Sequence, residues 1–137
     1  MTTSSTKKQI RVVAAVIQQE GRYLITQRRA QGSFPNMWEF PGGKVEASES
    51  EQQALQRELQ ERLAARVIVG DKLGEKEHHY PQHHVVLSLY AVQLPAGQTL
   101  QHLRVQNVAW VQPQELGLYE FPDVDQQALA LLGTDLP

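Results

Sequence analysis

The chain of 137 residues contains no cysteine, and this absence narrows the chemistry open to it. Without thiols there is no disulfide framework, no thiolate metal site and no cysteine nucleophile. No apolar run approaches the roughly 20 residues of a membrane-spanning helix. The polar residues 1–9 lack the apolar stretch of a signal peptide. We therefore expect a cytoplasmic protein in which a loose tail, residues 1–9, precedes one domain over residues 10–137.

A surplus of basic residues is also missing. The formal net charge is −2, with 13 lysine and arginine residues against 15 aspartate and glutamate residues. General nucleic-acid binders normally carry a basic surplus, so we expect no general binding to DNA or RNA. The hydrophobic fraction of 41% is typical of a soluble globular domain with a buried core. The sequence leaves open whether the protein is a monomer or a homodimer.

The hydrophobic pattern predicts strands that alternate with helices. Residues 10–17 form a near-continuous apolar run, typical of a strand buried on both faces, and residues 23–27 predict the returning strand of a hairpin. The other predicted elements are a loop at 28–36, strands at 66–70, 84–94 and 108–111, a turn at 113–116, and a helix at 123–132 with Val124, Leu129 and Leu132 as core contacts. This order indicates helices packed on a mixed sheet.

The main helix is predicted over residues 49–64. Ser48 followed by Glu51 matches a capping box at its start. Apolar residues then repeat at helical spacing and predict the buried stripe: Ala54, Leu55, Leu59 and Leu63.

A glycine pair stands shortly before this helix. Gly42 and Gly43 allow a carbonyl group to approach a ligand closely, and Lys44 follows as a natural phosphate contact. On the helix, Glu58 and Glu61 lie three residues apart and share one face. Magnesium prefers carboxylate oxygens and is often shared with substrate phosphates. The arrangement is therefore suited to a metal that neutralises a diphosphate and activates a water molecule.

The acidic face also has a simpler interpretation. Arg57 and Glu61 are four residues apart, and such a pair commonly forms a solvated salt bridge. For an arbitrary acidic helix this interpretation is the better one. The glycine–lysine loop at a fixed distance favours the metal site instead.

The spacing of these residues resembles the signature of the Nudix hydrolases. Gly43 is followed after five residues by Glu49, and after seven more by Arg57, Glu58 and, two beyond, Glu61. The sequence WEFPGGKVE at residues 38–46 resembles the MutT-like branch of that family. The resemblance implies an α/β fold, an α/β/α sandwich with a mixed sheet and helices on both faces.

The resemblance also implies an activity and a cofactor. Nudix enzymes hydrolyse a nucleoside diphosphate linked to a further group X; the usual MutT-like substrate is a nucleoside triphosphate, here including oxidised or modified ones. The products are a monophosphate and pyrophosphate, and the cofactor is Mg²⁺ or Mn²⁺. Glu58 and Glu61 match metal-binding acids, Gly42 matches a position whose carbonyl joins the metal shell, and Arg57 matches an arginine that orients the glutamates.

Three residues are candidates for substrate binding. Arg28 follows the hairpin strand where MutT-like proteins often place a phosphate-binding arginine, although with Arg29 beside it a solvated arginine is the alternative. Lys44 is a second phosphate candidate. Asp125 stands where MutT-like proteins place a residue that recognises the base; its alternative role is capping the last helix, which Asp123 can also do.

The sequence departs from the Nudix pattern at two helix positions. A second glutamate and a glycine are expected where Arg62 and Ala64 stand. Arg62 thus replaces a common metal ligand with a permanent cation. Two unit charges about 4 Å apart interact by about 4 kcal/mol at an effective dielectric near 20, so the change is large. A further acid, often found six residues before a tryptophan corresponding to Trp110, is replaced by Arg104.

These departures leave three interpretations open. The enzyme works with a thinner metal shell, Arg62 contacts phosphate directly, or the domain is catalytically impaired and binds a nucleotide or a partner without efficient turnover. A further class, the DNA-reading domain of adenine glycosylases, is disfavoured by the net charge of −2.

Four histidines cluster around the segment YPQ at residues 80–82: His78, His79, His83 and His84. Such a group could indicate zinc, but closed structural zinc sites have other spacings and usually include sulfur. A hairpin with exposed histidines is the favoured interpretation, and one or two of them are candidates for substrate contact.

Overall fold

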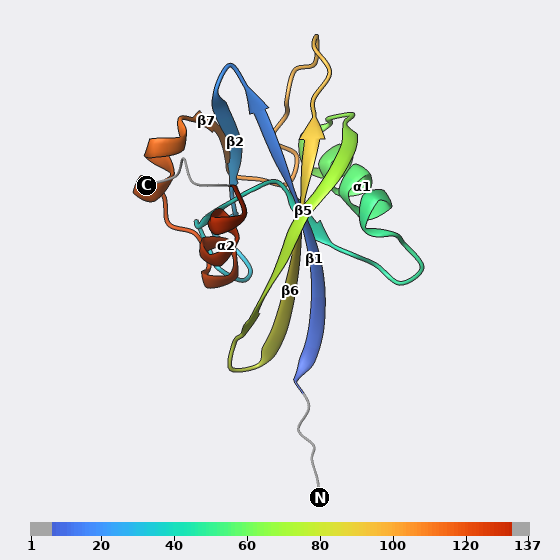
Figure 1. Cartoon of the computed structure of the whole chain (residues 1–137), viewed down its shortest axis with the longest axis vertical. Coiled ribbons are helices and arrows are strands. Elements are labelled where there is room, and N and C mark those ends of the chain that lie inside the picture. Colours follow the sequence, from blue (N-terminus) through green and yellow to red (C-terminus); the bar gives the residue numbers. More distant parts are fainter. Residues whose placement is uncertain (1–6, 133–137) are drawn as a thin grey trace, which may run out of the picture.

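The computed structural model describes residues 7–132. The elements, in chain order, are β1 (Lys8–Gln19), β2 (Arg22–Gln27), β3 (Trp38–Glu39), β4 (Gly42–Lys44), α1 (Glu51–Leu63), β5 (Ile68–His79), β6 (His83–Gln93), β7 (Asn107–Val111), the 3₁₀ segment η1 (Pro113–Leu118), α2 (Asp123–Ala128) and the 3₁₀ segment η2 (Leu129–Leu132) (Figure 1). Within this range, no helix combines the length and the apolarity needed to cross a membrane.

The sheet is mixed and is organised around β1. This strand pairs antiparallel with β2 and β4 and parallel with β6, and β5 continues the sheet beyond β6. On the other side, β3 and β7 both pair with β2. Helices α1 and α2 lie on opposite sides of the crossing strands (Figure 1). The predicted sandwich with a mixed sheet and helices on both faces is confirmed.

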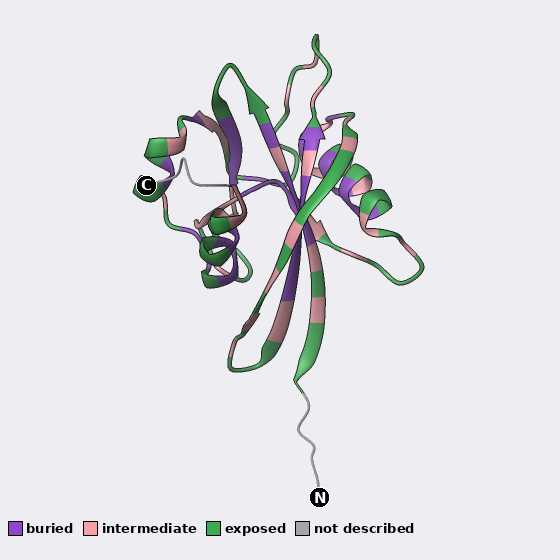
Figure 2. Cartoon of the chain, viewed as in Figure 1, coloured by how far each residue is buried: buried purple, intermediate pink, exposed green. Residues whose placement is uncertain are grey.

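The apolar run of β1 supplies both halves of the core. Successive side chains of a strand point to opposite faces. Val13, Ala15 and Ile17 therefore pack into the core cluster that contains the helix stripe of α1, whereas Ala14 packs into the cluster that contains α2. Figure 2 shows buried stretches on β1 and β6, whereas β5 is exposed or intermediate along its length. A strand covered on both faces explains why the run is continuous rather than alternating.

Several predicted boundaries were wrong. β1 begins at Lys8, so Lys8 and Gln9 are strand residues rather than part of a tail. β5 extends to His79, well beyond the predicted end at residue 70. The short strands β3 and β4 were not predicted, and the final helix ends at Ala128 and continues as η2. Short strands lack periodicity, and their pairing with β1 and β2 is decided by tertiary contacts.

The predicted cap of the main helix was also wrong by two residues. Ser50 is the N-cap: its hydroxyl accepts from the backbone nitrogen of Gln53 at 3.0 Å, and the Gln53 side chain accepts from the backbone nitrogen of Ser50. Ser48 lies in the left-handed region, with φ 73°, in the preceding turn. The predicted buried stripe of α1 is confirmed, since each of its residues is 0% exposed.

One carboxylate joins α1 to the sheet. Glu51 accepts hydrogen bonds from Tyr90 at 2.6 Å and from Ser88 at 2.8 Å, both on β6, and forms ion pairs with Arg11 and Lys72. Burial raises the pKa of Glu51, but these four donors outweigh it and lower that pKa to about 2. The charged form of Glu51 is therefore favoured in the folded state.

We predict that Glu51→Gln lowers the free energy of unfolding at neutral pH by about 2 kcal/mol, because charged acceptors contribute more than amides. The folded-state pKa lies below the unfolded one, so this stability is present above about pH 4.3 and lost as pH falls toward 2. Urea unfolding at several pH values measures it. Glu20→Gln, in an exposed turn, is the control; a difference that stays constant from pH 6 down to about 3 would contradict the assignment.

Candidate active site

A cavity of 250 Å³ opens between β4, the start of α2 and the loop after β2. Residues predicted for different roles line it together: Arg28, Gly42, Lys44, Glu58 and Asp125. The remaining predicted residues, Arg57 and Glu61, are joined to Glu58 by ion pairs described below. The structure thus brings the candidates from four separate segments to one place.

Glycine is required at both positions of the pair in β4. A Cβ atom on Gly42 would lie 1.9 Å from the carbonyl oxygen of Val13, so only glycine lets β4 pair this closely with β1. A Cβ atom on Gly43 would lie 2.2 Å from the carboxyl carbon of Glu58. The carboxylate of Glu58 therefore sits directly against the strand backbone, in space that any other residue would fill.

The backbone of β4 also presents a carbonyl to this place. The bonds from Ala15 nitrogen to Pro41 oxygen and from Val45 nitrogen to Arg11 oxygen show which β4 positions bond to β1. By the alternation of an antiparallel ladder, the carbonyls of Gly42 and Lys44 point away from β1. That of Lys44 accepts from Arg57 at 2.9 Å. A carbonyl and two carboxylates form an all-oxygen donor set, which fits a hard divalent cation.

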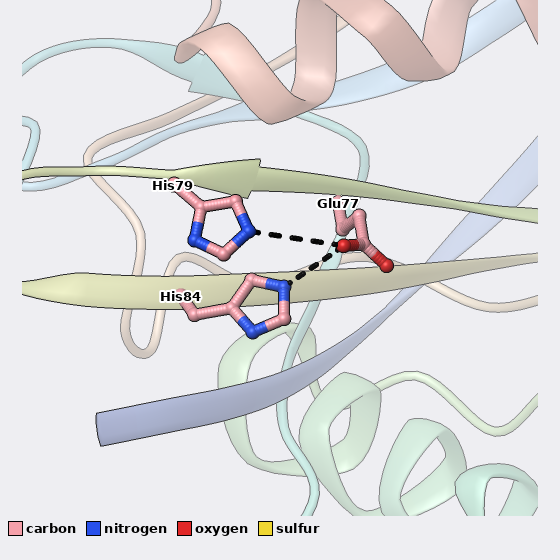
Figure 3. Close-up of side chains that lie close together, drawn as sticks. All are labelled: Glu77, His79 and His84. Atoms are coloured by element: carbon pink, nitrogen blue, oxygen red, sulfur yellow. Dashed lines mark hydrogen bonds and ion pairs between the residues drawn. The ribbon is translucent and has the colours of Figure 1, made fainter. Parts of the chain in front are cut away.

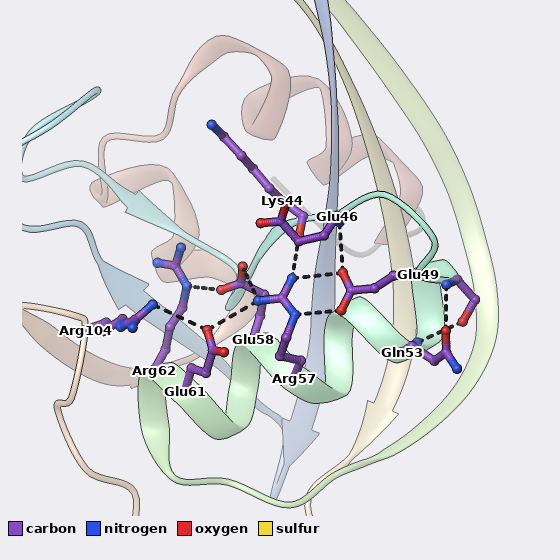
Figure 4. Close-up of polar contacts among 10 residues, drawn as sticks. Lys44, Glu46, Glu49, Gln53, Arg57, Glu58, Glu61, Arg62 and Arg104 are labelled. Atoms are coloured by element: carbon purple, nitrogen blue, oxygen red, sulfur yellow. Dashed lines mark hydrogen bonds and ion pairs between the residues drawn. The ribbon is translucent and has the colours of Figure 1, made fainter.

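Arg57 is the centre of the ion-pair network on α1 (Figure 4). Its guanidinium makes two hydrogen bonds to Glu49, at 2.6 and 3.0 Å, and further bonds to Glu58 at 3.2 Å and Glu61 at 3.3 Å. The hydrogen bond to Glu49 is the main cause that raises the pKa of Arg57. The predicted salt bridge to Glu61 is present, but it is one part of a network that holds three carboxylates in place.

The two arginines that depart from the Nudix pattern both contact the acids. The Nε of Arg62 donates to Glu58 at 2.7 Å, and Arg62 lines the cavity. Arg104 reaches the carboxylate of Glu61 at 3.4 Å. Glu58 is only 6% exposed, so its charge is compensated by Arg57 and Arg62 rather than by water.

A buried polar group forms the other end of the cavity. Arg28 donates to Glu39 at 3.0 Å and is held by the loop through Ser33. It is thus not the solvated arginine of the alternative interpretation. Burial raises the pKa of Glu39, while Arg28 and Arg62 lower it. Burial also raises the pKa of Asp125, and the charge of Glu39 raises it further.

Asp125 does not cap the last helix. The N-cap of α2 is Pro122, which makes no side-chain capping bond. Instead, the nitrogen of Val124 donates to the hydroxyl oxygen of Tyr80 at 3.1 Å. Asp125 is 8% exposed and lines the cavity, whereas Asp123 has a side chain that is 69% exposed. Lys44 is exposed at the cavity edge, with its side chain directed away from Arg57 (Figure 4).

Sequence reasoning missed Glu39 and Tyr80. Glu39 lies inside the segment WEFPGGKVE, and its position next to a buried strand could have marked it as a candidate. Tyr80 comes from the hairpin between β5 and β6, and its ring packs on Phe34 at 5.1 Å. No local signal connects this hairpin turn to Arg28 and Asp125, which line the same cavity, so only the fold reveals Tyr80.

Comparison with known proteins identifies the family. A family model for the NUDIX domain matches residues 12–131. The chain belongs to the Nudix family. It is 38% identical over 119 residues to the CTP pyrophosphohydrolase of Escherichia coli K12, covering 86% of this chain and 87% of that protein. It is also 38% identical over 87 residues to the 8-oxo-dGTP diphosphatase of Proteus vulgaris, covering 63% and 78%.

A solved structure is similar to this chain over most of its length. The solution structure of the Escherichia coli ORF135 protein is 36% identical and superimposes with a TM-score of 0.74, covering 92% of this chain and 89% of that one. The match spans both core clusters, so the similarity concerns the whole sandwich rather than the Nudix signature alone.

Helix α1 ends at Ala64, whose backbone has a conformation that favours glycine. Its φ is 56° and its ψ is 34°, in the left-handed region, while its nitrogen donates to the carbonyl of Gln60. A Cβ atom in that region costs roughly 1–2 kcal/mol. The helix therefore ends in the left-handed conformation that suits the glycine of the Nudix pattern, but with alanine in that position.

We predict that Ala64→Gly raises the free energy of unfolding by about 1 kcal/mol, because it removes this strain. Equilibrium urea unfolding measures the change. Ala47→Gly, at an exposed position outside the left-handed region, is the matched control and should be neutral or slightly destabilising. Equal effects of the two substitutions would show that Ala64 carries no strain.

Proposed function

We propose that this protein is a metal-dependent pyrophosphohydrolase of nucleoside triphosphates, including oxidised or modified ones, that releases a monophosphate and pyrophosphate. One observation carries the proposal: a single cavity extends from Glu58, beside the glycine pair of β4, to the buried side chain of Asp125. A nucleotide needs both, since its phosphates require cations and its base requires a desolvated pocket. The names of the relatives, a CTP pyrophosphohydrolase and an 8-oxo-dGTP diphosphatase, support this substrate class.

The phosphate end is built for a divalent ion. We assign Glu58, Glu61 and the Gly42 carbonyl as the residues that hold Mg²⁺ or Mn²⁺. When bound, such an ion neutralises phosphate charge and lowers the pKa of a coordinated water. Lys44 supplies a mobile positive charge to the phosphates from the cavity edge. Arg57 positions the two glutamates, because it bonds to both carboxylates at once.

The proton of the attacking water is taken up by a carboxylate of this cluster. Glu58 lines the cavity beside the glycine strand, Glu61 is joined to it through Arg57, and a positioned carboxylate is an effective base. Glu58 is held rigidly by Gly43 and two arginines, whereas the side chain of Glu61 is 37% exposed and freer to move. Both are catalytic candidates, with Arg57 as their positioning residue.

The base end is suited to hydrogen-bond recognition. A protonated carboxyl group both donates and accepts, while a carboxylate only accepts. The raised pKa of Asp125 favours the protonated form, so Asp125 can offer a donor and an acceptor to the edge of a base. Arg28, ion-paired to Glu39, sets the charge of this end and is the second phosphate candidate.

A second candidate function rests on Arg62. Its Nε lies 2.7 Å from the carboxylate oxygen of Glu58 and so competes with a metal for that oxygen. A domain in which this ion pair persists would bind nucleotide without efficient turnover. We also infer that the chain from the start of β1 onward forms one domain, which the family match over residues 12–131 supports. The cytoplasmic location and the monomeric or homodimeric state stay predictions.

We predict that the parent protein hydrolyses nucleoside triphosphates with Mg²⁺ or Mn²⁺, and that Glu58→Gln lowers kcat by about 10²–10⁴-fold. Phosphate release over a panel of nucleotides measures it, with pyrophosphatase added to convert pyrophosphate. Glu20→Gln keeps the parent rate and controls for contaminating activity. An inactive parent with an active Arg62→Glu variant, or tight nucleotide binding without metal, would favour the impaired domain instead.

We predict that KM rises with pH if the protonated form of Asp125 recognises the base. Because this pKa is raised, the Asp125 hydroxyl donor is present at low pH and is lost as pH rises through the pKa. Binding therefore weakens as pH rises. Asp125→Asn keeps a donor at every pH and should give a flat profile, measured from about pH 6 to 9. Asp123→Asn is the exposed control; a parent profile as flat as that of Asp125→Asn would reject the role.

A further inference from the structure

A second group of metal-ligating side chains lies on the β5–β6 hairpin, outside the cavity (Figure 3). Glu77 and His79 are two residues apart on β5 and so point to the same face. His84 on β6 is the direct cross-strand partner of His79. The predicted hairpin is present, although of its four histidines His78 and His84 are only partly exposed, and two of the four gather with this carboxylate.

The other two histidines point to the opposite face. His78 packs toward α2, where its Nδ1 lies 3.0 Å from the Gln127 amide and its Nε2 3.5 Å from Asp123. His83 precedes His84 and alternates with it along β6. The hairpin therefore presents a set of three potential ligands on one face and provides a natural control residue on the other.

The donor atoms are close to the spacing that a metal needs. The Nε2 of His84 lies 3.1 Å from a carboxylate oxygen of Glu77, and the Nε2 of His79 lies 3.9 Å from the same oxygen. Ligands about 2.05 Å from a tetrahedral ion are about 3.3 Å from one another. One distance already fits, and the other must shorten by roughly half an ångström.

The imidazole rings must also turn. The rings of His79 and His84 are stacked, with centroids 4.0 Å apart and an interplanar angle of 3°. A metal lies in the plane of each imidazole that binds it, and parallel planes do not meet, so one ring has to rotate about χ2. The side chain of His79 is 58% exposed, and the χ2 well of histidine is broad, so this rotation is cheap.

We propose that Glu77, His79 and His84 bind a divalent transition-metal ion, with Zn²⁺ as the best match, and leave its remaining positions to water or an external ligand. Two imidazoles and one carboxylate suit zinc, whereas magnesium prefers an all-oxygen set. The site thus differs in metal preference from the Gly42, Glu58 and Glu61 set. Bound metal joins β5 to β6 beside the turn that carries Tyr80, which lines the cavity.

The test is a Zn²⁺ titration of the untagged, metal-free protein without nucleotide or Mg²⁺, by competition with a chromophoric chelator. Loss of a ligand in His79→Ala, His84→Ala or Glu77→Gln should weaken Zn²⁺ binding by about tenfold or more. His83→Ala, on the opposite face, should bind as the parent does. NMR signals of His79 and His84 should shift on addition of Zn²⁺, whereas those of His83 should not.

Two outcomes would overturn the proposal. Either the parent binds Zn²⁺ no more tightly than His84→Ala, or Glu58→Gln rather than the hairpin variants removes binding. The second outcome would place the ion in the cavity. Because Zn²⁺ binding and triphosphate hydrolysis are measured separately, an inactive parent that still binds Zn²⁺ through His84 would reject the proposed function alone.

Discussion

The contact between the Glu58 carboxylate and the backbone of Gly43 is the constraint on which the site depends. Strand β4 pairs with β1 only because Gly42 has no side chain, and α1 approaches β4 only because Gly43 has none. The apolar stripe of α1 then buries the other side of the helix in the core. Strand pairing, helix packing and placement of the acid are therefore one arrangement.

That arrangement buries a negative charge, and arginines compensate it. A carboxylate 6% exposed loses most of its hydration, and breaking a buried ion pair commonly costs several kcal/mol. Arg57 compensates Glu58 from the side of Glu49, and Arg62 compensates it from the cavity side. A divalent ion would also compensate the negative charge of Glu58, so Arg62 and a metal ion are alternative partners for the same carboxylate.

The acidic side chains at the two ends of the cavity have different surroundings. At the glycine strand, guanidinium groups contact the carboxylates of Glu58 and Glu61. At the far end, burial raises the pKa of Asp125 and of Glu39; Arg28 lowers both, and Arg62 also lowers that of Glu39. The loop after β2 holds Arg28, while the hairpin turn contributes Tyr80, so residues distant in the chain shape the pocket.

The sequence by itself determined the elements with strong periodicity and the chemistry with fixed spacing. The doubly buried β1, the stripe of α1, and the shared helix face of Glu58 and Glu61 follow from local patterns whose geometry is set within one strand or one helix. The helix cap was misplaced by two residues because serines at 48 and 50 offer similar local signals. Which of them caps is decided by the turn that Glu49 and Arg57 hold.

Only the tertiary structure decided which residues share a cavity and which charges they carry. From the sequence, Asp125 was a candidate for capping or for base contact. The fold shows that it is buried near Glu39 and does not cap the helix. Arg62 and Arg104 were departures from a pattern until the fold placed each on a glutamate. Glu77, His79 and His84 lie together because of the register between β5 and β6, which the local sequence does not predict. Burial and cross-strand contact are properties of the packed chain, and they set the solvation on which this chemistry depends.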